Sequence, residues 1–150
     1  MNTYFLTATH ILCYLVFAQK RGAAATSEEI AFNILLHPSN VRKLAFLLSE
    51  KELIRPTQGV KGGYGLAKKA ELISLADIYA AVGELNPDFL GVQKMTDKSK
   101  KCTTVIKGVQ TILNSQIRKI ESEMIQSLAQ VFISDVCEQT LKLLEVKNVF

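Results

Sequence analysis

Basic residues are concentrated between positions 42 and 69, and of all residues in this sequence they are the best suited to bind a charged partner. The segment holds seven Lys or Arg residues against two Glu residues, a local charge of +5 in a chain whose formal charge is +4. A patch of this kind can bind a polyanion such as nucleic acid. An ordinary solvated face can carry the same charge, so charge alone leaves both interpretations open. The bases are Arg42, Lys43, Lys51, Arg55, Lys61, Lys68 and Lys69.

The cysteines and histidines form no recognisable catalytic or metal-binding motif. Cys13, Cys102 and Cys137 are widely spaced, without a CxxC pair or a disulfide framework, which is typical of a reducing compartment. We expect Cys13 in the core and Cys137 half-buried on a short amphipathic helix. His10 and His37 lie far apart, and the chain has no phosphate-binding loop or nucleophile motif, so we predict that it is not an enzyme.

The first element that must support these residues is a helix over residues 3–20, which lack Gly and Pro. Its apolar side chains recur at helical spacing on most sides, so most sides should be packed. The apolar run 11–18 is far shorter than the roughly 20 residues of a membrane span. Lys20 and Arg21 follow this run, whereas a signal peptide has its bases first. We predict a buried helix in a cytoplasmic protein with no membrane partner.

Two short helices joined by a tight turn should follow. The segment Thr26-Ser27-Glu28-Glu29 fits a capping box, in which the Thr26 hydroxyl accepts from the Glu29 amide and the Glu29 carboxylate reaches back. Pro38 suits the first turn of the next helix, which we place from Pro38 to Glu50. This pair predicts a helix-turn-helix unit. Polar residues lie towards the outside near the start of the second helix, namely Ser39, Asn40, Arg42 and Lys43.

A β-hairpin is expected next. Residues 53–55 and 64–66 are short strand candidates, and the loop 58–63 between them is rich in glycine. The glycines allow positive φ angles and let the backbone approach another surface closely. A hairpin after a helix-turn-helix is a wing. The predicted fold class is therefore mainly α with a small β-hairpin wing, a winged helix-turn-helix.

The second half of the chain predicts a separate long helix. Ser74 caps a helix that ends at Gly83, and the polar segment 84–101 is interpreted as a linker. A helix from about Cys102 to Leu128 would be about 40 Å long, too long to bury its apolar face against a domain of 1–83. We expect it to pair with a copy of itself, and packing within one chain is the alternative. The predicted dimerisation residues are Val105, Val109, Ile112, Ile117, Ile120 and Met124.

These elements divide the chain into three predicted parts. Residues 1–83 form the winged helix-turn-helix domain, 84–101 the linker, and 102–150 the long dimerisation helix with a last helix from about Ser134 to Leu144.

The order of these elements resembles the Rrf family of bacterial transcriptional regulators, which includes IscR, NsrR, CymR and the YwnA-like proteins. The resemblance covers residues 1 to about 130. Each motif alone is weak, but their order and spacing together are specific. They are Ala8-Thr9-His10-Ile11-Leu12, Thr26-Ser27-Glu28-Glu29-Ile30-Ala31, Pro38-Ser39-Asn40-Val41-Arg42-Lys43-Leu44, Lys61-Gly62-Gly63-Tyr64-Gly65-Leu66-Ala67 and the stretch 73–82.

The resemblance implies a homodimer that places the helix 38–50 in the major groove of a double-stranded DNA operator and the wing 56–65 in the minor groove. Gln58 stands where many members have an arginine, so the minor-groove contact should differ, with Lys61 or Arg55 supplying charge. Tyr64 is more suited to packing the hairpin than to stacking on bases. The candidate DNA-binding residues are Thr26, Ser27, Ser39, Asn40, Arg42, Lys43, Arg55, Gln58, Lys61, Gly62, Gly63 and Tyr64.

The sensing part of such a regulator is less clear from the residues. Several members bind an iron–sulfur cluster through three cysteines before the long helix, and here only Cys102 lies where the last of them would be. We therefore expect no iron–sulfur cluster and no other cofactor. Cys102 follows Lys98, Lys100 and Lys101 near a helix N-terminus, and because both features lower a thiol pKa, a redox-sensing thiol is one of two open interpretations. The alternative is a passive residue, with the signal carried by a ligand or a partner protein.

The function predicted from the sequence is that of a homodimeric DNA-binding transcriptional regulator, a repressor that acts by occlusion. Two alternatives stay open: a winged-helix module that binds only proteins, and a redox-sensing regulator acting through Cys102. The basic segment 42–69 argues against the first alternative, because a wing that binds only protein has no need of that charge.

Overall fold

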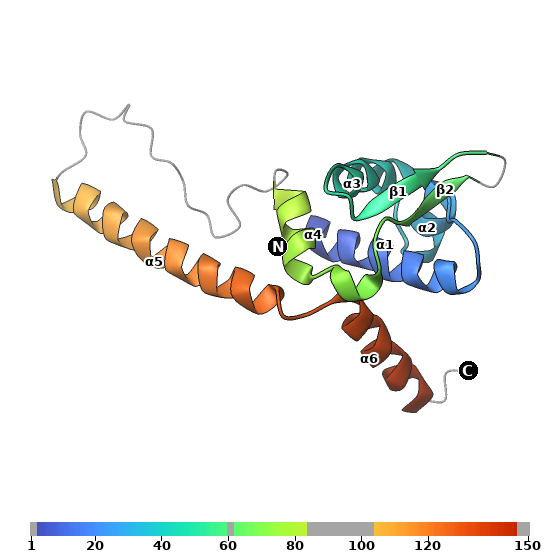
Figure 1. The fold of residues 1–150 in the computed structure, drawn as a ribbon. Helices are drawn as coiled ribbons and strands as arrows, with labels where there is room; N and C mark the ends of the chain where they lie inside the picture. The colour runs from blue at the N-terminus through green and yellow to red at the C-terminus, as the bar shows by residue number, and fades with distance from the viewer. Residues whose placement is uncertain (1–2, 60–61, 84–103, 147–150) are drawn as a thin grey trace.

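Six α-helices and one antiparallel hairpin form the part of the chain that the computed structural model describes, which is residues 3–59, 62–83 and 104–146. The predicted fold class is confirmed (Figure 1). The elements in order are α1 Thr3–Lys20, α2 Ser27–Asn33, α3 Pro38–Glu50, β1 Ile54–Thr57, β2 Gly63–Leu66, the short 3₁₀ helix η1 Ala70–Leu72, α4 Leu75–Val82, α5 Thr104–Leu128 and α6 Ile133–Val146.

Side-chain caps set the starts of three helices. The Thr26 hydroxyl accepts from the Glu29 amide at 3.1 Å, as predicted for α2. The second half of that capping box is wrong, because the Glu29 carboxylate accepts a hydrogen bond from the Tyr14 hydroxyl at 2.7 Å instead. At α3 the cap is His37, whose Nδ1 accepts from the Ser39 amide, and Pro38 takes the first turn. Ser74 and its partner Asp77 form a complete capping box at α4.

The hairpin also pairs with a backbone segment outside its two strands. Its two strands pair from Ile54 opposite Leu66 to Thr57 opposite Gly63. Tyr64 also pairs with Ala25, just before α2, through N–H···O bonds of 2.8 and 3.1 Å. Strand β2 is thereby tied to the segment just before the helix-turn-helix unit.

The core of the domain surrounds α1. Its buried residues Ile11, Leu12 and Leu15 belong to one apolar cluster with residues of α3 and α4, such as Leu44 and Ile78. The helices predicted at 3–20, 38–50 and after Ser74 therefore pack as their apolar spacing indicated.

The last helix, α6, packs on α1, and Ile133 and Cys137 are buried in the same core cluster. The Ile133 amide donates to the Ile73 carbonyl at 2.9 Å, which fixes the entry to α6. Cys137 is thus fully buried instead of half-buried, and Cys13 is half-buried instead of lying in the core. Cys137 is buried because α6 packs on α1, whereas Cys13 lines a groove on the surface of α1.

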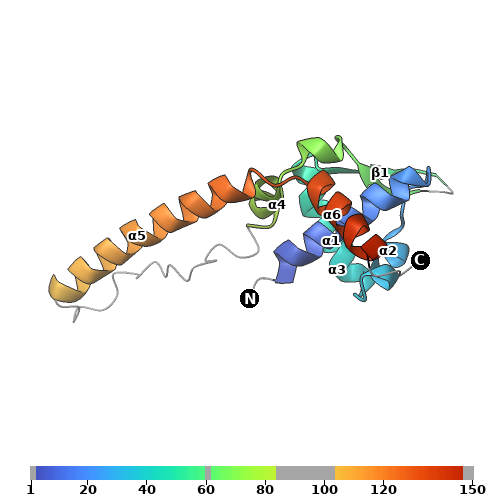
Figure 2. The same ribbon diagram turned by 90° about the horizontal axis from the view of Figure 1, so that it is seen from below.

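The long helix α5 projects from the domain in both views (Figures 1 and 2). With 25 residues it spans about 37 Å. Its C-terminal half contacts α4, where the Tyr79 hydroxyl donates to Glu121 at 3.3 Å. Burial and Glu121 raise the pKa of Tyr79. No helix in the described ranges is both long and apolar enough to cross a membrane.

Several predictions from the sequence lie outside the described residues. They are the linker 84–101, the candidate thiol Cys102 and the wing residue Lys61. These stay predictions.

Candidate nucleic-acid interface

The helix α3 and the hairpin lie on one side of the domain, with α1 in the middle and α6 on the other side (Figure 1). This arrangement follows from the burial pattern of α3. Val41, Leu44, Ala45 and Leu48 face the core and are buried. The exposed residues of α3 therefore lie on the side of the helix opposite the core.

The exposed face of α3 is polar over its first two turns. Ser39, Asn40, Arg42 and Lys43 are all exposed, which agrees with the outward placement expected from the sequence. One turn further on, Phe46 is 64% exposed. Sequence reasoning missed Phe46, although its position three and four residues after Lys43 and Arg42 puts it on the same face.

Arg42 is held by the neighbouring helix. Its Nη1 lies 2.9 Å from the Glu28 carboxylate and donates to the Ser27 hydroxyl at 3.1 Å. The Ser27 hydroxyl in turn donates to Glu28 at 3.0 Å. Hydrogen bonds from its own backbone amide and from Ser27, together with the Arg42 charge, lower the pKa of Glu28. A carboxylate thus lies beside one of the basic residues predicted to bind DNA, and the sequence analysis assigned Glu28 no role at that site.

The other candidate residues of α2 have internal roles as well. The Thr26 hydroxyl is occupied as the cap of α2, and Ser27 is buried. The side of α2 that faces α1 is anchored by Tyr14, which bonds to Glu29 and accepts from Asn33 at 3.2 Å. Burial is the largest cause that raises the pKa of Tyr14, and the hydrogen bond to Glu29 raises this pKa further. These contacts fix α2 relative to α1 and so fix the support of Arg42.

Lys43 also has a defined position. Its Nζ lies 5.2 Å from the centre of the Tyr4 ring, a cation–π distance. The two basic side chains of α3 therefore lie apart: Arg42 contacts α2, and Lys43 contacts the start of α1.

The glycines of the wing are required by the wing itself. Gly59 has a φ of 109°, as a positive-φ loop position predicts. A Cβ at Gly62 would lie 2.6 Å from the Thr57 carbonyl oxygen, and one at Gly63 would lie 2.5 Å from that of Ala25. The close approach that we expected of these glycines is thus made to the chain's own backbone.

The remaining described wing residues divide into exposed and packed ones. Arg55 and Gln58 are exposed, so they are available to a ligand. Tyr64 is half-buried against the core cluster, which agrees with the packing role expected for it.

Known proteins are similar to this chain in both sequence and fold. The chain matches the Rrf2 family, described as iron-dependent transcriptional regulators, over residues 1–139. YwnA of Bacillus subtilis is 28% identical over 136 residues, covering 91% of this chain and 96% of that protein. YffB of Lactococcus lactis is 25% identical over 124 residues, covering 77% and 72%. Both relatives carry the name of a helix-turn-helix-type transcriptional regulator.

Solved structures agree. A chain described as a DNA-binding protein superposes with a TM-score of 0.69 at 25% identity, covering 89% of this chain and 98% of that one. A transcriptional regulator from Lactobacillus plantarum has a TM-score of 0.75 at 18% identity over the full length of both chains. CymR of B. subtilis has a TM-score of 0.62 at 20% identity, covering 93% and 96%, and shows the same fold. The chain therefore belongs to the Rrf2 family of transcriptional regulators, winged-helix proteins with a DNA-binding fold that are not enzymes.

Proposed function

We propose that this regulator binds operator DNA as a homodimer and represses transcription by occluding the promoter. The observation that carries the proposal is the polar, exposed face of α3 on the same side of the domain as the hairpin (Figure 1). In this proposal α3 enters the major groove and the wing 56–65 follows the minor groove.

The residue types on that face suit DNA. Arg42 and Lys43 can bind phosphates or guanine edges, and Ser39 and Asn40 can read bases or grip phosphate. Arg55 and Gln58 are exposed on the wing and suit the minor groove. Thr26 and Ser27 support α2 and Arg42 in the free protein, so we expect their contribution to be mainly one of positioning.

The direct test is a mobility-shift titration with genomic fragments selected for binding to the wild-type chain. Arg42→Ala with Lys43→Ala should weaken binding by about 10-fold or more and reduce the dependence on salt. The matched control is Lys142→Ala, which removes a base from α6 on the other side of the domain. Unchanged affinity and salt dependence in the α3 variant would contradict α3 as the DNA-reading helix.

The same experiment separates this proposal from its alternative. A winged-helix module that binds only proteins would select no genomic fragment above the level of random DNA. Repression is tested separately, by transcription in vitro from a promoter within a selected fragment. The regulator should lower the transcript yield, and a higher yield would indicate an activator.

We also propose that the regulator works without an iron–sulfur cluster, although the family is described as iron-dependent. A cluster needs several thiolate or comparable ligands together. The sequence has three cysteines, of which Cys13 on α1 is half-buried and Cys137 on α6 is buried in the core cluster. Within the described ranges, no three His, Cys, Asp or Glu side chains come together as metal ligands would. Purification without oxygen should give a colourless chain, and bound iron in stoichiometric amount would contradict the proposal.

A further inference from the structure

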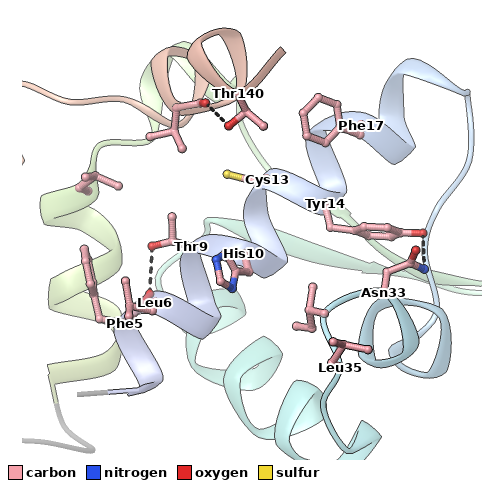
Figure 3. Close-up of a pocket in the computed structure, with 13 residues that line it drawn as sticks. Phe5, Leu6, Thr9, His10, Cys13, Tyr14, Phe17, Asn33, Leu35 and Thr140 are labelled. Carbon is pink, nitrogen blue, oxygen red and sulfur yellow. Dashed lines mark hydrogen bonds between the residues drawn. The ribbon is translucent and has the colours of Figure 1, made fainter. Parts of the chain in front are cut away.

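An exposed aromatic side chain lies on the outer face of α3. Phe46 is 64% exposed, whereas Leu44 and Leu48, which α3 turns to the core, are buried. Exposure of an aromatic ring to water is unfavourable. Other exposed apolar side chains, such as Leu6 and Leu35, line the groove of about 690 Å³ along α1 (Figure 3). None of the residues of α3, all of which the structure describes, lines that groove, so Phe46 belongs to a different surface.

Phe46 lies in the middle of the face that we propose for DNA binding. Successive residues turn by about 100° around a helix axis, which puts Phe46 between Arg42, about 40° away, and Lys43, about 60° away. Ser39 lies about 20° from it, two turns earlier. These four residues span about 10 Å along the axis, within the roughly 12 Å width of the major groove. The exposed residue one turn beyond Phe46 is the acidic Glu50, which is unsuited to phosphate.

The two basic side chains leave the middle of this face to Phe46. Arg42 lies 2.9 Å from Glu28 on α2, and the Nζ of Lys43 lies 5.2 Å from the Tyr4 ring at the start of α1. In the major groove, phosphates border the two sides and base edges form the floor. Basic residues at the sides of the face therefore suit the phosphates, and the ring between them suits the base edges.

A phenyl ring has one favourable partner on the floor of the major groove. Every base pair presents hydrogen-bond donors or acceptors there, and an A·T pair adds the C5-methyl group of thymine. A ring that covers a polar base edge displaces water and returns no hydrogen bond, which costs free energy. Burial of a methyl group against the ring is favourable.

We propose that Phe46 determines part of the operator sequence by packing on the C5-methyl group of a thymine, with Arg42 and Lys43 on the phosphates to either side. The inference rests on the proposed function, because it takes α3 as the helix that enters the major groove. It goes further by assigning one residue to one kind of base. Each half-site bound by an α3 helix should therefore contain an A·T pair opposite Phe46.

The test replaces single thymines of the operator by deoxyuridine, which lacks only the C5-methyl group. A fragment selected by the wild-type chain is shortened to the smallest duplex that keeps full affinity, and fluorescence anisotropy gives the dissociation constant after each replacement. The wild-type chain should lose about 4-fold in affinity at the thymine that Phe46 contacts, as expected for one buried methyl group. Phe46→Ala should bind the unmodified duplex more weakly and should show no further loss at that thymine.

The matched control is Phe32→Ala, which removes another exposed ring, 82% exposed, from α2. This variant should keep the wild-type response to deoxyuridine. Because both rings are exposed, both variants should melt close to the wild-type temperature.

Two results would overturn the role of Phe46. One is equal affinity of the wild-type chain for every deoxyuridine duplex, a result that needs no variant. The other is a Phe46→Ala chain that keeps the full wild-type response. A wild-type chain that selects no DNA would contradict the proposed function and this inference together, whereas a chain that binds DNA without sensing the methyl group would contradict this inference alone.

Discussion

At the level of single residues, the side chains on the exposed face of α3 are held in position in the free protein. Arg42 is bonded to Ser27 and Glu28, and Lys43 lies over the Tyr4 ring. Both partners of the ion pair are more than half exposed, at 51% and 66%, so the pair itself adds little stability. The ion pair matters for the proposed DNA binding, because a DNA phosphate would have to compete with Glu28 for the Arg42 guanidinium.

Glu28→Gln should therefore strengthen DNA binding. The change removes a negative charge that repels phosphate and competes for Arg42, so we expect the dissociation constant to fall by about 2–5-fold at low salt. Mobility-shift titrations at several salt concentrations measure this. Glu138→Gln is the matched control, because Glu138 pairs with Lys142 on α6, away from the interface. Weaker binding of Glu28→Gln would mean that Glu28 positions Arg42 more than it competes for it.

At the level of elements, the wing depends on a close backbone contact with the segment before α2. Gly63 lies against Ala25, and the neighbouring residue Tyr64 pairs with Ala25 through two backbone bonds. Within the same strand, Gly65 has open space where a Cβ would stand. The two glycines of β2 therefore differ, although the sequence presents them alike on either side of Tyr64.

Gly63→Ala should destabilise the domain by about 1–3 kcal/mol, because the added methyl group forces Ala25 and β2 apart. Gly65→Ala is the control, and its effect should stay within about 0.5 kcal/mol. Urea unfolding measures both. We also expect Gly63→Ala to weaken DNA binding more than Gly65→Ala does, because it displaces the wing. Equal stability of the two variants would show that the contact at Gly63 is relieved without cost.

At the level of the whole molecule, α5 has a long apolar face that the described residues of the chain leave exposed. Val105 is 74% exposed, Ile112 63% and Ile120 55%, while Ile117 and Met124 are half-buried. Monomeric proteins rarely expose a contiguous apolar surface of this kind. This supports the proposed homodimer, in which the two α5 helices would cover each other.

Ile112→Asp with Ile120→Asp should give monomers by light scattering, because the charges would be buried at the dimer interface. Both side chains are exposed in the single chain, so the domain itself should keep its melting behaviour apart from the loss of the dimer. Thr111→Asp with Ser122→Asp places the same charges on the opposite face of α5 and should leave the dimer intact. A dimer that persists in the first variant would place the interface elsewhere.

The sequence by itself determined the fold class and the limits of most elements. The starts of α2, α3 and α4 could be predicted because a helix cap depends on residues within a few positions, as Thr26, Pro38 and Ser74 show. The outward face of α3 and the uncovered face of α5 followed from apolar spacing along a single helix. For the candidate site, this local information was enough to identify the polar residues of α3 as exposed.

Only the tertiary structure decided the contacts between segments that are distant in the sequence. It turned Glu29 to Tyr14, placed Glu28 beside Arg42, brought Ala25 against Gly63, and packed α6 on α1 so that Cys137 is buried. Such contacts depend on how the helices pack around one core, and no spacing within a single helix or loop encodes that packing. The exposed basic residues of α3 could therefore be predicted from the sequence alone, whereas the ion pair of Arg42 with Glu28 could not.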